Sequence, residues 1–83
     1  MKTYHFQLVL RRPTTEEEDE QLFEQFEGRV SPAVANGMPL LFIHLEAPSM
    51  EHAIQDAVRG ARSLGLEVER VELDPDTVTA DAA

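Results

Sequence analysis

The side chains of this sequence best suited to acid–base chemistry or metal binding are its three histidines, His5, His44 and His52. His5 and His44 fall in segments that read as neighbouring strands, where with a carboxylate they could form a metal site or a pH-sensitive patch. However, the histidines show none of the HxxH, HxxxH or HExxH spacings, and adjacent strands bring many unrelated pairs together. We therefore predict surface histidines and no metal site.

Arg11-Arg12 is the basic pair of the sequence, and it precedes the expected start of a helix, where anions often bind. The acidic run Glu16–Glu20 already occupies that helix end and would repel a phosphate. The same run lacks EF-hand spacing and a loop glycine, so it reads as a solvated helix face and not as a calcium site. Neither charged segment predicts a ligand.

Nucleophilic catalysis has no candidate in this sequence. The serines occupy strand, cap and helix positions without a nucleophile elbow or an oxyanion loop, and the four glycines are dispersed and form no phosphate-binding loop. We predict no catalytic residue, no cofactor-binding residue and no cofactor, and hence that the protein is not an enzyme.

Length and composition indicate one small domain. The chain has 83 residues, of which 42% are hydrophobic and 28% charged, which is ordinary for a globular protein. We predict a single α+β domain over residues 1–74 and a flexible acidic tail over residues 75–83.

Charge and cysteine content indicate which partners and which cellular compartment to expect. Seven basic and sixteen acidic residues give a formal net charge of −9, which repels nucleic-acid backbones, so no direct nucleic-acid binding is expected. Cysteine is absent, which removes disulfides and fits a reducing compartment. The N-terminus has no apolar signal core, and the longest apolar run is short, so we expect a cytoplasmic protein with no membrane partner.

The first structural element expected along the chain is a strand. Residues 3–10 alternate with period two and are enriched in aromatic and β-branched residues, which predicts a strand that Pro13 ends. Thr14 or Thr15 can then cap a helix, because each has a glutamate three residues further on. Gly28 is expected to end this helix.

A hairpin is predicted in the middle of the chain. Asn36-Gly37 separates two apolar segments and suits a type I′ turn, because both residues accept positive φ angles. The segment before it, residues 29–35, contains Pro32, which cannot donate a ladder hydrogen bond and is therefore expected in an edge strand. The strand after it is expected over residues 40–46.

A second helix and a last strand complete the pattern. Ser49 is a suitable N-cap, the apolar and alanine residues that follow have helical spacing, and Gly65 suits the position after the helix end. Residues 66–73 then alternate except for a slip in phase, which predicts a strand with a bulge near Glu69-Arg70.

The order strand, helix, hairpin, helix, strand predicts a ferredoxin-like βαββαβ two-layer sandwich with antiparallel sheet order 4-1-3-2. This sheet order places the proline-containing strand at an edge. Both helices are expected to cover one face of the sheet, packing on the apolar side of its two central strands: Tyr4, Phe6, Leu8, Leu10, Leu41, Ile43 and Leu45.

The uncovered face of that sheet would be partly apolar, and such a face often marks an interface. We predict that this face, or an edge strand, mediates contact with a second copy or with another protein. The predicted interface residues come from the two central strands: His5, Gln7, Val9, Leu40, Phe42 and His44.

Several short segments carry a resemblance to a known group of proteins: Tyr4–Leu10, Glu46-Ala47-Pro48-Ser49, Ala53-Ile54, Ala57-Val58, Gly65-Leu66-Glu67-Val68, Val71-Glu72 and Asp76–Thr79. With them the chain resembles the N-terminal domain of small bacterial helix-turn-helix regulatory proteins. It departs from that group at His44-Leu45, where the family has an Asp-Arg pair, and no helix-turn-helix follows the last strand. The resemblance therefore implies a regulatory or interaction domain, and neither DNA binding nor any functional residue is carried over.

Three functional hypotheses follow. The leading one is a non-enzymatic protein-interaction module that homodimerises and docks another protein. The alternative is an ACT-like small-molecule sensor whose ligand would lie at a dimer interface of the same fold. The third is an acylphosphatase-like enzyme, for which Arg11-Arg12-Pro13-Thr14 is a poor substitute for the required anion-binding loop.

Overall fold

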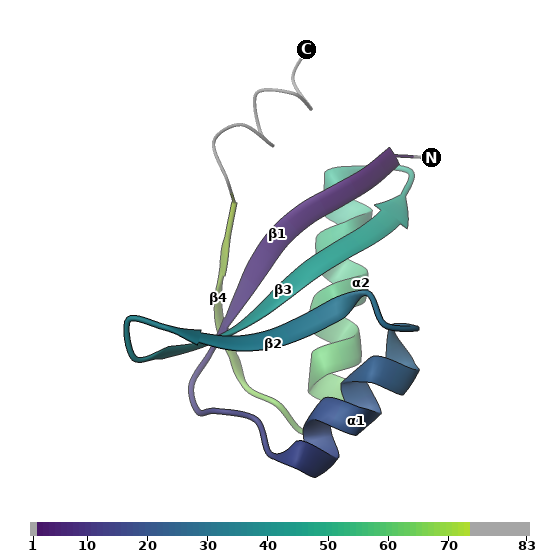
Figure 1. The fold of residues 1–83 in the computed structure, drawn as a ribbon. Helices are drawn as coiled ribbons and strands as arrows, with labels where there is room; N and C mark the ends of the chain where they lie inside the picture. Colours follow the sequence, from purple (N-terminus) through teal and green to yellow (C-terminus); the bar gives the residue numbers. More distant parts are fainter. Residues whose placement is uncertain (1, 74–83) are drawn as a thin grey trace.

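The computed structural model describes residues 2–73, and its six elements are coloured along the chain in Figure 1. The expected tail, residues 75–83, lies outside the described residues. Within residues 2–73, neither helix combines the length and the apolar character needed to cross a membrane. The elements are β1 (Lys2–Leu10), α1 (Glu16–Gln25), β2 (Val30–Ala35), β3 (Met38–Ala47), α2 (Met50–Ser63) and β4 (Val68–Glu72).

The strands form one antiparallel sheet in the order β2-β3-β1-β4, which confirms the predicted α+β class and the 4-1-3-2 order. The hairpin turn is the expected one, since Asn36 and Gly37 have φ angles of 53° and 76°. Pro32 consequently lies in an edge strand, where its missing N–H leaves the ladder to β3 intact.

The predicted bulge in the last strand is also confirmed. Arg70 pairs with Val9 and Val68 pairs with Leu10, so Glu69 is the extra residue of β4. The strand begins two residues later than expected, because the N–H of Leu66 donates to the carbonyl of Ala61 and closes the end of α2.

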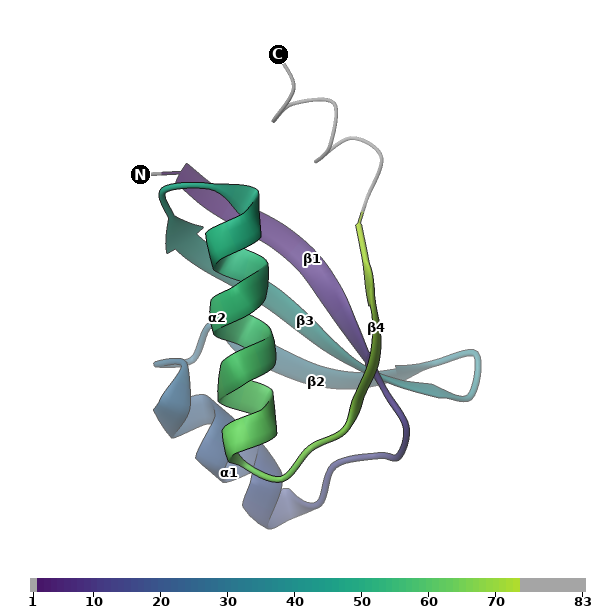
Figure 2. The same ribbon diagram turned by 180° about the vertical axis from the view of Figure 1, so that it is seen from behind.

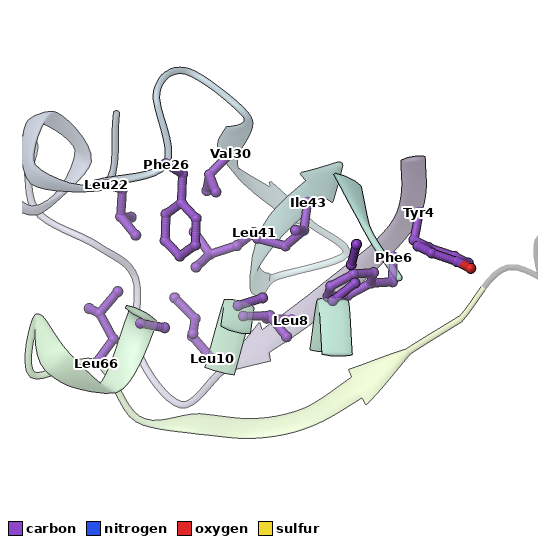
Figure 3. Close-up of a cluster of buried hydrophobic side chains, with 14 residues drawn as sticks. Tyr4, Phe6, Leu8, Leu10, Leu22, Phe26, Val30, Leu41, Ile43 and Leu66 are labelled. Atoms are coloured by element: carbon purple, nitrogen blue, oxygen red, sulfur yellow. The ribbon is translucent and has the colours of Figure 1, made fainter. Parts of the chain in front are cut away.

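The helices differ in position from the prediction. Both contribute to the buried cluster of Figure 3, but α1 packs mainly against the edge strand β2, whereas α2 packs against β3, β4 and β1. The reason is local: α1 ends at Gln25, and positive φ angles at Glu27 and Gly28 turn the chain directly into β2. A connection this short holds the end of α1 beside the start of β2.

Close packing fixes α2 on the sheet. Ala53, Ala57 and Ala61 are fully buried, and their small side chains let the helix backbone approach the strands. Gly60 faces α1, where the ring of Phe26 occupies the space that a Cβ atom at position 60 would need. Gly60 therefore leaves room for the ring of Phe26, which follows the end of α1, to pack against α2.

The start of α1 is held by a capping box with an added ion pair. The Thr15 side chain accepts from the Glu18 N–H at 3.2 Å, and the Glu18 carboxylate accepts from the Thr15 N–H at 2.9 Å. Arg12 donates both of its terminal nitrogens to the same carboxylate at 2.8 and 2.7 Å. These hydrogen bonds, first from Arg12 and then from Thr15, lower the pKa of Glu18 to about 2.

A methyl group at position 60 should destabilise the protein. In an open helix Gly→Ala would stabilise by about 1 kcal/mol, but the overlap with Phe26 should make Gly60→Ala lower the free energy of unfolding by about 1–2 kcal/mol. Urea unfolding followed by circular dichroism measures this change. Combining Gly60→Ala with Phe26→Leu should cost less than the sum of the single variants, and strict additivity would show that the contact is not the cause.

The Glu18 interaction should make stability depend on pH at acidic values. Because the folded-state pKa of about 2 lies below the ordinary value of 4.5, the stabilisation is complete above pH 4.5 and is lost as the pH falls toward 2. In urea unfolding series, the stability advantage of the wild type over Glu18→Gln should shrink over this interval. Glu17→Gln removes an equal charge from the same turn, and an equal effect of this control would contradict the assignment to Glu18.

Candidate functional site

The side of the sheet opposite the helix-side core is the candidate site, and we call it the open face; in Figure 1 the sheet lies in front of α2. Cross-strand pairing places His5 beside His44, Gln7 between Phe42 and Glu72, and Val9 between Leu40 and Arg70. Side chains of directly paired residues point to the same side of a sheet. The open face thus comprises Thr3, His5, Gln7, Val9, Ser31, Ala33, Ala35, Met38, Leu40, Phe42, His44, Glu46, Arg70 and Glu72.

Phe42 is the exposed aromatic side chain of the open face. Its relative exposure is 39%, although large apolar side chains in the centre of a sheet are usually covered. Beside it lies a shallow hollow of about 130 Å³. The hollow is lined by His5, Phe6, Gln7, Phe42, Ile43 and His44. An exposed ring next to an unfilled hollow is a suitable contact point for another protein surface.

His5 and His44 meet on the open face as the sequence suggests. They are direct cross-strand partners, and their rings stack with centroids 6.0 Å apart and an interplanar angle of 24°. Among residues 2–73 there is no group of three or more histidine, cysteine or carboxylate side chains that could hold a metal ion. The pair is therefore a flat, polarizable platform at the edge of the Phe42 hollow.

Val9 and Leu40 lie on the open face but have exposures of only 1% and 5%, and neither belongs to the helix-side core. Arg70 is a long side chain on the same face. Its side chain starts beside Val9 on β4 and reaches the sulfur of Met38 on β3, with Nη2 and Sδ 3.4 Å apart. The aliphatic stem of an arginine can shield apolar surface in this way while its charge stays in water. The predicted interface set thus divides into the accessible His5, Gln7, Phe42 and His44 and the buried Val9 and Leu40.

Arg70 is a residue of this site that the sequence did not single out. Carboxylates on the same strand hold its guanidinium group, with Glu69 at 3.1 Å and Glu72 at 3.8 Å. The alternation of β4 placed Arg70 on one side of the strand, but the bulge at Glu69 made that side uncertain from sequence. The contact of Arg70 with Met38, across β1, depends on the sheet order and the register.

The other charged candidates occupy ion pairs and caps. Arg12 donates both of its terminal guanidinium nitrogens to Glu18. The Nε atom of Arg11 lies 3.9 Å from Oε2 of Glu67. His52 is exposed, and its Nδ1 lies 2.8 Å from the hydroxyl of Ser49 at the start of α2. Arg12 and His52 therefore stabilise the starts of the two helices.

Comparisons of this chain with protein-family models, with curated proteins and with solved structures gave no match.

Proposed function

We propose that this chain is a non-enzymatic protein-interaction module that pairs with a second copy through the open face. The observation that carries the proposal is the exposed Phe42 ring beside a hollow, on the face that also carries the His5–His44 platform and Arg70. In a symmetric pair each Phe42 could fill the hollow of the other copy, which is the self-complementary contact that a twofold interface needs.

The edges of the sheet are less suited to pairing than the open face. Pro32 removes a backbone donor from the β2 edge, and the β4 edge carries the charged residues Glu69, Arg70 and Glu72. Proline and charged side chains are the usual means by which edge strands avoid pairing with other chains. This leaves the open face as the larger contact surface.

The charge distribution also favours the open face. The net charge of −9 makes two copies repel each other, but seven of the sixteen acidic residues lie between positions 16 and 27, in and just after α1. Pairing of sheet against sheet, about 10 Å apart, would leave the two α1 helices on the outer sides of the dimer. The strongest negative regions would then be farthest apart.

We also propose a ferredoxin-like fold for this chain. We place the chain with the ferredoxin-like sandwiches because element order and sheet order agree with them, although α1 lies toward β2. An ACT-like small-molecule sensor has less support than an interaction module. In a dimer through the open face, each copy would contribute only the Phe42 hollow of about 130 Å³, whereas small-molecule pockets span about 300–1,000 Å³.

Removal of the Phe42 ring should weaken self-association. Phe42→Thr keeps a good strand former but should raise the dimer dissociation constant at least about thirtyfold, since a central aromatic contact contributes about 2 kcal/mol or more. Sedimentation equilibrium measures the change. Phe23 is 64% exposed on α1, so Phe23→Gln is the matched aromatic control and should leave the constant unchanged. A wild-type chain that stays monomeric at high concentration would refute the proposal.

Added salt should strengthen the dimer. Each copy carries a net charge of −9, and raising the ionic strength from about 0.01 M to 1 M shortens the Debye length from about 30 Å to about 3 Å, which screens the repulsion between copies. Sedimentation at both ionic strengths should give a lower dissociation constant in high salt. Weaker association in high salt would indicate an interface made by opposite charges, against the open-face arrangement.

A further inference from the structure

The second surface of interest lies on the helix side, along the flank of α2 that faces away from α1. One flank of α2 meets α1 at Gly60, while Ile54 and Val58 lie on the other flank. These two residues are only partly buried and pack against the core together with Val68 and Val71 of β4. Because α1 sits toward β2, no helix of the described chain covers α2 on the β4 side, as Figure 2 shows.

A groove follows this flank. One hollow, of about 470 Å³, is lined by Ile54, Gln55, Val58, Arg59 and Arg62. A second, of about 300 Å³, is lined by Arg11, Arg62, Leu66, Glu67 and Val68. Arg62 borders both hollows, and we call the two together the α2 groove.

The α2 groove is basic in an acidic protein. Within residues 2–73, Arg59 and Arg62 have no carboxylate in ion-pair contact, whereas Arg12 and Arg70 are both held by glutamates. The two free guanidinium groups border the apolar side chains Ile54 and Val58. This combination suits an extended segment that carries carboxylates around a small apolar side chain.

We propose that residues 74–83 of this same chain bind in the α2 groove. The segment continues from Leu73, which follows β4 and is 40% exposed. It carries Asp74, Asp76 and Asp81, no basic residue, and one larger apolar side chain, Val78. The carboxylates match Arg59 and Arg62, and Val78 matches the apolar wall of Ile54 and Val58.

Length and tethering favour this occupant over a separate molecule. Ten residues can span about 33 Å, and the stretch of α2 from Ile54 to Arg62 is about 12 Å long. Asp74-Pro75 is a sequence that initiates turns, so the chain can reverse after β4 and run back along α2. A short tether gives an effective concentration in the millimolar range, which makes even weak ion pairs sufficient. The inference concerns the helix side and does not depend on pairing through the open face.

A spin label tests this arrangement in the full chain. Because the sequence has no cysteine, Ala80→Cys provides one attachment site for a nitroxide, whose effect on amide signals is read by nuclear magnetic resonance. We expect the strongest line broadening at residues 54–62. Arg59→Glu with Arg62→Glu should lower the ratio of bound to unbound tail about tenfold, since two attractions between opposite charges become repulsions between like charges.

Controls separate the groove from general electrostatics. Lys2→Glu with Arg29→Glu makes the same change in net charge away from the α2 groove and should leave the broadening at residues 54–62 in place. Adding Asp76→Arg and Asp81→Arg to the Arg59/Arg62 variant should restore it. Uniform broadening over the chain, or equal loss in both charge variants, would overturn the proposal. Broadening at residues 54–62 of unlabelled copies mixed with labelled ones would assign the groove to a second copy and would also overturn the proposal.

Discussion

Ala53, Ala57 and Ala61 let α2 approach the sheet closely, because on the helix side only their methyl groups stand between its backbone and the side chains of the strands. The other features of the molecule depend on this contact. With α2 held against β1 and β3, the ring of Phe26, just after α1, packs at Gly60. α2 lies over one face of the four-stranded sheet and α1 packs at its β2 edge, so the reverse face and the β4 flank of α2 are left for other contacts.

Arg70 gives the open face its particular shape. It reaches from β4 to Met38 on β3, on the face where Val9 and Leu40 are buried. Phe42 is left as the large apolar side chain of that face with substantial exposure, beside the stacked rings of His5 and His44. A single exposed aromatic group beside a hollow is compatible with solubility, and it concentrates the energy of a contact in one place.

Charge separates the two sides of the molecule. Acidic residues cluster in α1, where the first turn of the helix favours them and where Glu18 is held by Arg12 and Thr15. The basic residues Arg59 and Arg62 lie on α2, where no carboxylate of residues 2–73 neutralises them. The open face carries the carboxylates of Glu46 and Glu72 together with the guanidinium group of Arg70. The protein can therefore present a contact surface of small net charge despite its total net charge of −9.

The sequence by itself determined the features that depend on near neighbours along the chain. Alternation over residues 3–10, the Asn36-Gly37 turn, a capping box at Thr14 or Thr15 and Pro32 were sufficient for the α+β class and the sheet order, and the slip in phase within residues 66–73 was sufficient for the bulge in β4. The same alternation placed six residues on the open face, because the side-chain period of a strand decides which side a residue faces. It could not decide whether that side is covered: Val9 and Leu40 are buried on it while Phe42 is exposed, and Arg70, which crosses this face to Met38, is adjacent to Val9 only through strand pairing. The position of α1 beside β2 follows from the short turn at Glu27 and Gly28, but the groove beside α2 was decided only by tertiary packing, since its lining includes residues as distant in sequence as Arg11 and Arg62.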